Sequence, residues 1–105
     1  MHYHHLGIPT NEPKTGETYL KGFKTYVTDH ESNPYGIQWM RFNSDCPLPE
    51  LVKRVPHVAF RVANLEEAIA GKDILIEPNS PSAGMMVAFI VVDDAPVEFL
   101  QIEKA

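Results

Sequence analysis

The sequence has a single cysteine, Cys46, and no long apolar run. A lone cysteine excludes a disulfide within the chain and a zinc site built from several thiolates. We interpret Cys46, in "SDCPLPE", as a semi-exposed linker thiol, since no activating neighbour is evident. No apolar run approaches the roughly 20 residues that a membrane-spanning helix needs. The N-terminal "MHYHHLGIPT" lacks the charged-then-apolar order of a signal peptide, so we expect a cytoplasmic protein with no membrane partner.

Basic residues are also scarce. The chain carries nine Lys and Arg against 14 Asp and Glu, a formal net charge of −5, and the basic residues form no stripe. We therefore expect no nucleic-acid partner. The length of 105 residues and the 44% hydrophobic content indicate one domain, 1–105. A chain this short has little stability to spare, and with the aromatic strand "IQWMRF" this leads us to expect a homodimer.

The chain contains an imperfect internal repeat. If His5 is aligned with His57, "HHLGIPT" and "PHVAFRV" each place a histidine before a strand-like alternation. Late in each half, an apolar strand holds an oxygen-bearing side chain, Gln38 in "YGIQWMRF" and Glu98 in "APVEFLQI". We infer two related modules, about 1–45 and 55–105. The proline-rich residues 46–54 between them are expected to form an extended linker.

The second module has the clearer pattern. Strand alternation over 57–62 places His57, Ala59 and Arg61 on one face. Asn64 is a typical helix N-cap, and it predicts a helix over 65–72 that covers the opposite face. "DILIEP" predicts a short strand, and "MMVAFIVV" and "VEFLQI" predict an antiparallel hairpin through "DDAP". The predicted order is a strand, a helix and three strands.

The first module is shorter and less regular. Strands are predicted in "YHHLGIP", "FKTYVTD" and "IQWMRFNS". Pro13 and Gly16 disfavour a helix in "NEPKTGETYLKG", so we expect this module to lack the helix. One of its strands could be missing as well. "DHESNPYG" is typical of a solvated polar turn.

Four residues recur at matched places in the two modules: His5, Gln38, His57 and Glu98. Three of them have an ordinary structural explanation, because a histidine that opens a strand is often only hydrogen-bonded and Gln38 could face water. Glu98 is different, since its neighbours are apolar and burying an unpaired carboxylate is costly. Together the two imidazoles and two oxygen donors suit a divalent metal such as Zn, Ni, Mn or Fe, with positions open for water or substrate.

The segments "HHLGI", "PHVAFRVANLEEAIAG" and "PVEFLQI" resemble the vicinal oxygen chelate superfamily, which contains glyoxalases, bleomycin-resistance proteins and extradiol dioxygenases. The resemblance is clear in residues 55–103 and loose in 1–45. It implies an α+β fold in which two unequal βαβββ-type modules, the first reduced, form a curved mixed sheet around a cavity. It also implies that His5, Gln38, His57 and Glu98 are the metal ligands.

The first module departs from the family pattern in its missing helix, its short spacing and the adjacent histidines His4 and His5. Strand alternation lets only one of these two side chains face a cavity. His2 is in phase with His4, so we assign that pair to a solvated face and His5 to the cavity. Trp39 and Arg41 are out of phase with Gln38, which favours core or interface packing for both.

The resemblance leads us to expect a metal-dependent lyase or isomerase acting on a small oxygenated metabolite. The ion would stabilise an enediolate, and Glu98 would act as the catalytic proton carrier. Arg61 shares the His57 face and is a candidate for binding a substrate carboxylate, with a surface ion pair as the alternative. Two other functions stay open at this point: metal-free drug binding of the bleomycin-resistance type, and an iron-dependent dioxygenase.

Overall fold

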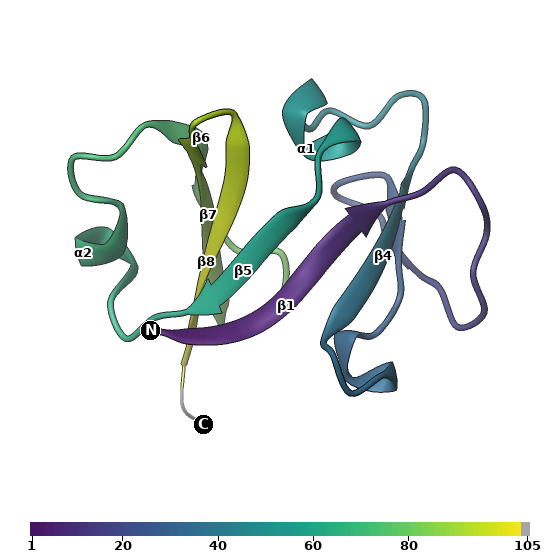
Figure 1. The fold of residues 1–105 in the computed structure, drawn as a ribbon, viewed down its shortest axis with the longest axis horizontal. Coiled ribbons are helices and arrows are strands. Elements are labelled where there is room, and N and C mark those ends of the chain that lie inside the picture. The colour runs from purple at the N-terminus through teal and green to yellow at the C-terminus, as the bar shows by residue number, and fades with distance from the viewer. Residues whose placement is uncertain (104–105) are drawn as a thin grey trace.

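The computed structural model describes residues 1–103, through which one curved sheet of eight strands runs in the order β2-β3-β4-β1-β5-β8-β7-β6 (Figure 1). The strands are β1 His2–Pro9, β2 Thr18–Leu20, β3 Thr25–Val27, β4 Ile37–Phe42, β5 His57–Arg61, β6 Ile74–Asn79, β7 Met85–Val92 and β8 Ala95–Ile102. Two short α-helices, α1 Glu50–Arg54 and α2 Leu65–Ile69, and a 3-10 turn, η1 His30–Ser32, complete the described chain. The predicted α+β class with a curved mixed sheet is confirmed.

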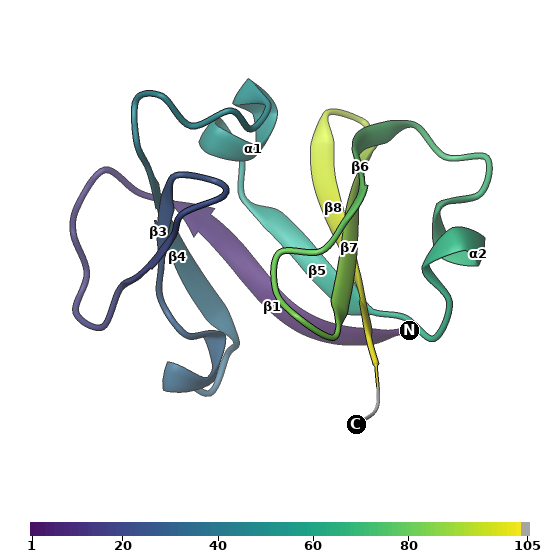
Figure 2. The same ribbon diagram turned by 180° about the vertical axis from the view of Figure 1, so that it is seen from behind.

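The pairing pattern is the same in the two halves of the sheet. β1 runs parallel to β4, and β5 runs parallel to β8. In each half two further strands add antiparallel pairings towards the sheet edge. β1 and β5 pair antiparallel at the centre and join the halves. Figure 2 shows β3 and β4 on one side of this central pair, with β6, β7 and β8 on the other.

Helix α2 lies outside the curve of the sheet, as Figure 1 shows. The side chain of Asn64 accepts a hydrogen bond from the Glu67 backbone N–H at 3.0 Å, which confirms the predicted N-cap. The helix ends at Ile69 rather than near Lys72, because Ala70 leaves helical geometry and Gly71 follows with a φ of 72°. Leu65, Ala68 and Ile69 pack in one apolar cluster with side chains of β5, β7 and β8.

The first module lacks the α-helix within the described residues, as predicted, but it retains all its strands. Residues 10–17 connect β1 to β2 without a helix. The expectation that a strand was at risk is wrong, because the short edge strand β2 pairs antiparallel with β3.

The segment 46–54 is not a purely extended linker. Pro49 is the N-cap of α1, where the missing N–H of a proline costs nothing, and Val52 of this helix is fully buried. Cys46 is buried rather than semi-exposed, and its Sγ lies 3.5 Å from the Thr25 Oγ1. The prolines therefore begin a helix that packs against the sheet.

Strand alternation gives the sheet two chemically different faces. Ala88 and Ile90 of β7, with Phe99 of β8, face α2 in the apolar core. Val87, Phe89, Glu98 and Leu100 line a cavity of about 280 Å³ in the curve of the sheet. No helix among residues 1–103 is long and apolar enough to cross a bilayer.

Candidate metal centre

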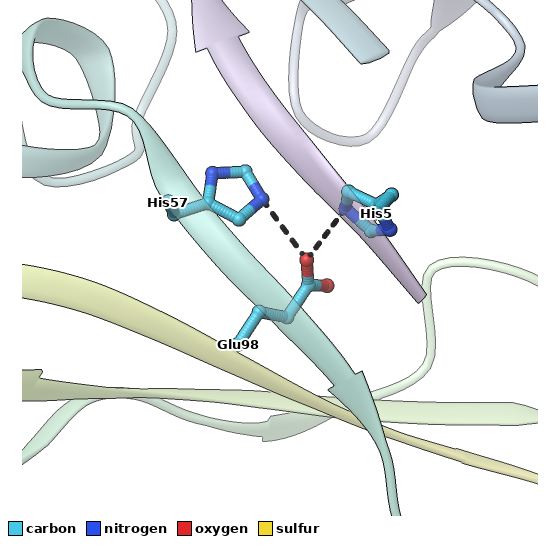
Figure 3. Close-up of side chains that lie close together, drawn as sticks. All are labelled: His5, His57 and Glu98. Carbon is cyan, nitrogen blue, oxygen red and sulfur yellow. Dashed lines mark hydrogen bonds and ion pairs between the residues drawn. The ribbon is translucent and has the colours of Figure 1, made fainter. Parts of the chain in front are cut away.

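His57 and Glu98 project from neighbouring parallel strands towards one another (Figure 3). The His57 Nε2 lies 3.1 Å from the Glu98 Oε1, in a hydrogen bond that is buried. Had these side chains pointed to opposite faces of the sheet, no shared metal ion would be possible. The requirement that they share a face is met.

His5 approaches the same carboxylate from β1 (Figure 3). Its Nε2 lies 3.2 Å from the Glu98 Oε1, within ion-pair distance, but the angles do not make a hydrogen bond and this buried nitrogen has no other partner. One ligand atom from each of His5, His57 and Glu98 lies within 4.8 Å of the other two. Two ligands of a tetrahedral zinc ion stand roughly 3.3 Å apart, so this buried cluster could hold a metal ion.

The strand register places the candidate ligands at equivalent positions in the two halves. Gln38 on β4 pairs with Gly7, two residues after His5. Glu98 on β8 pairs with Ala59, two residues after His57. The alignment of His5 with His57 and of Gln38 with Glu98, made from the sequence, is therefore reproduced by backbone pairing.

Gly7 makes room for the His57 imidazole, a role that sequence patterning missed. The two residues are direct partners across the β1–β5 pair. A Cβ atom at position 7 would lie 2.1 Å from the His57 Cε1 and 2.6 Å from each ring nitrogen. The ring therefore lies directly over the Gly7 backbone, and no larger residue fits beneath it.

The assignment of His4 to a solvated face is wrong. Tyr3 pairs with Phe60 and His5 with Ala59, so His4 is the extra residue of a β-bulge that interrupts the alternation. Both His4 and His5 line the cavity, and their Nδ1 atoms lie 2.8 Å apart. Only His2 is exposed, as expected. Burial, then the neighbouring His5 and His30, lower the pKa of His4.

His30 also belongs to the cavity wall rather than to a merely solvated turn. Its ring centroid lies 4.3 Å from that of His4 and 5.8 Å from that of His5. The Asp29 side chain caps the 3-10 turn that presents His30, accepting a hydrogen bond from the Glu31 N–H. No local pattern could place this turn beside β1, because the contact depends on the sheet order.

The remaining candidates separate clearly. Gln38 lines the same cavity as His5 and Glu98. Arg61 is exposed and lines a different hollow, together with His2 and Gln101, so it does not reach into this cavity. Arg41 is held by two hydrogen bonds to Glu17 and does not line the cavity. The Lys14 ammonium group lies over the Trp39 ring, with its Nζ 4.7 Å from the ring centroid.

The electrostatics of the centre are set by the carboxylate between two imidazoles. Burial raises the pKa of Glu98, but the contacts that its carboxylate makes with the His5 and His57 imidazoles outweigh burial and lower this pKa to about 2. The two imidazoles offset the burial of the carboxylate, so Glu98 stays ionised.

This lowered pKa predicts a loss of stability in acid for the metal-free protein. A carboxyl with a folded pKa below its unfolded value stabilises the fold above the unfolded value. We expect that contribution, on the order of a few kcal/mol, to disappear as pH falls from about 4.5 towards 2. Urea unfolding of wild type and Glu98→Gln from pH 6 to pH 3 measures it. The stability difference between the two proteins should shrink in acid, and parallel pH profiles would contradict the prediction.

Comparisons with known proteins support the fold and supply no function. A scan of protein-family models and a search of curated proteins found no match to the chain. Among solved structures, the chain is similar to the crystal structure of a hypothetical protein from Bacillus halodurans C-125, with a TM-score of 0.74 and 19% identity. The match covers 98% of this chain and 95% of that one. This likeness shows that the two proteins share a fold, and any function must be argued from the cavity and its histidines.

Proposed function

We propose that the chain binds one divalent metal ion, Zn, Ni, Mn or Fe, through His5, His57 and Glu98, with Gln38 as a further ligand. We propose further that it is a lyase or isomerase of the glyoxalase type, within the vicinal oxygen chelate superfamily. Its substrate would be a small oxygenated metabolite. The observation that carries this proposal is the convergence of three buried donor atoms from β1, β5 and β8, two of which, on His5 and Glu98, also line the cavity.

The residues present fit such an ion. Two imidazole nitrogens and a carboxylate oxygen are the donor set of many catalytic sites with open positions. The His5 Nε2 is buried without a hydrogen-bond partner, a cost that a bound ion would remove. When bound, the ion supplies positive charge that stabilises negative charge developing on substrate oxygens.

Glu98 would be the group that moves a proton. Its Oε1 takes both histidine contacts, which leaves Oε2 free of them (Figure 3). Glu98 is ionised and can therefore accept a proton from a carbon next to a substrate carbonyl, although its lowered pKa makes it a weaker base than an ordinary carboxylate. The cavity around it has mainly apolar walls.

His4 would act as a positioning residue for this centre. If the His5 Nε2 binds the ion, the His5 Nδ1 carries the proton and donates it to the His4 Nδ1, 2.8 Å away. That bond fixes the ring of His5 and leaves the His4 Nε2–H as a donor. A second imidazole thus takes the place that a carboxylate or carbonyl usually has beside a metal-binding histidine.

Metal analysis tests the proposal. The protein is purified without an affinity tag and a nickel column, because the segment "HYHH" could bind nickel from the column. Protein prepared in this way should retain about one ion per chain. Adding metal to the stripped protein should release protons, and affinity should fall as pH drops through the histidine range. Turnover is then assayed on dicarbonyl, hydroxyacid and catechol compounds. Metal binding without turnover on any of them would remove the enzyme proposal and leave the metal site.

Drug sequestration of the bleomycin-resistance type is the second candidate, and the predominantly apolar cavity wall favours it. On that alternative, the purified protein contains no metal and returns aromatic ligands chemically unchanged. An iron-dependent dioxygenase, the third candidate, would instead consume oxygen with a catechol only when loaded with Fe²⁺. Oxygen uptake and mass spectrometry of the recovered ligand separate the three.

A further inference from the structure

The cavity beside the candidate metal centre is lined mainly by apolar side chains from both halves of the chain. They include Leu20, Phe23, Val27, Met40, Ile76, Met85, Val87, Phe89 and Leu100. Among the described residues, none of the lining side chains is a lysine or an arginine. The uncharged polar residues Gln38, Asn79 and Ser82 also line the cavity.

Four basic side chains outside the cavity have other positions or partners. Arg41 is held by Glu17, and Lys24 pairs with Asp45 at 2.9 Å. Lys53 donates to the Cys46 backbone carbonyl at 2.7 Å. Arg61 lines a separate hollow. A ligand with a charged tail would therefore find no cationic side chain for it within this cavity.

We infer, on the basis of the proposed function, that the ligand is a small oxygen chelator whose body is apolar and carries no second charged group. A cavity of about 280 Å³ holds a molecule on the order of ten non-hydrogen atoms, by comparison with the volume of water. Its oxygens face the metal centre, next to His4 and His30, and its apolar body lies against β7 and β4. Phosphorylated and carboxylate-tailed metabolites are disfavoured.

The charge of the loaded centre does not alter this selectivity. A divalent ion beside the Glu98 carboxylate keeps positive charge, but the chelating oxygens of the ligand neutralise it. A distant carboxylate on the same ligand would meet mainly apolar side chains and the uncharged donors of Gln38, Asn79 and Ser82, so it would lose hydration without gaining a lysine or arginine partner, which is costly. Selectivity is thus decided by the cavity wall and not by the metal.

Two ligands with the same chelating group test the inference. 4-Methylcatechol and 3,4-dihydroxybenzoate both offer neighbouring oxygens and differ in a methyl group against a carboxylate. Calorimetry on Zn²⁺-loaded protein under nitrogen gives the affinity for each ligand. Each value is divided by the affinity of the same ligand for Zn²⁺ in water, which removes the difference in chelating strength. The methyl compound should bind at least about tenfold more tightly. Equal binding, tighter binding of the carboxylate, or binding of neither ligand would overturn the inference.

A matched pair of variants locates the effect in the cavity wall. Ser82 is exposed in a loop and lines the cavity, so Ser82→Arg adds a cation there without disturbing the core. Ser44 is exposed outside the cavity, and Ser44→Arg is the control. Only Ser82→Arg should reduce the ratio of the affinity for 4-methylcatechol to the affinity for 3,4-dihydroxybenzoate. An equal change of this ratio in the two variants would overturn the inference. Protein that binds none of Zn²⁺, Ni²⁺, Mn²⁺ and Fe²⁺ would instead remove the proposed function itself.

Discussion

Replacing His57 with alanine is expected to weaken Zn²⁺ binding by at least about a hundredfold, because it removes one of three buried donors. The remaining His5 and Glu98 hold an ion far less well, and the Glu98 carboxylate also loses its hydrogen bond from His57. Competition against a chromophoric chelator measures the affinity. His2→Ala, which removes an exposed histidine at the start of β1, should leave the Zn²⁺ affinity unchanged.

Thermal unfolding with and without Zn²⁺ separates this effect from a failure to fold. A ligand that binds the folded state raises its stability, so Zn²⁺ should raise the melting temperature of wild type and of His2→Ala, but not of His57→Ala. Glu98→Gln provides a second variant, since it keeps an oxygen donor and removes the charge. We expect weaker metal affinity from it and, in an active enzyme, a larger fall in kcat than change in KM. Unaltered Zn²⁺ affinity in both variants would contradict the site.

The second large effect is expected from Gly7→Ala, which adds only a methyl group. The new Cβ would lie 2.1 Å from the His57 Cε1, so the imidazole must leave its place over the β1 backbone. His57 is 1% exposed and packs against Phe89, with ring centroids 5.0 Å apart, so it has little space to move into. We expect a loss of stability of about 1–3 kcal/mol, as for other overpacked sites, together with loss of the metal-induced stabilisation.

Gly22→Ala is the control for this substitution. A Cβ at Gly22 meets nothing within 4 Å, so stability and metal binding should both stay close to wild type. Urea unfolding gives the stability of each variant, and the chelator competition gives its affinity. If Gly7→Ala bound Zn²⁺ as tightly as wild type, the close approach of the ring to Gly7 would be unimportant for the site.

The homodimer stays a prediction, for which light scattering is the measurement.

Local chemistry along the chain was enough to predict several features of this protein. Two apolar segments between Met85 and Ile102, separated by "DDAP", specified the hairpin, and Asn64 specified where a helix starts, because both signals act between residues near in sequence. The matched histidines and oxygen donors could be recognised because the two halves repeat a pattern. Proline content was less informative, since Pro49 begins a helix in a segment that was expected to be extended.

Tertiary structure decided which side chains share the cavity. The bulge between Tyr3 and His5 turns His4 inward against the simple alternation, and the order of the sheet brings His30 beside it. Arg61 shares a predicted face with His57 but lies beyond the cavity, because the curve of the sheet carries the end of β5 away from the site. The room for the His57 ring comes from Gly7 on another strand. Such contacts join residues far apart in sequence, and only the register of paired strands sets them.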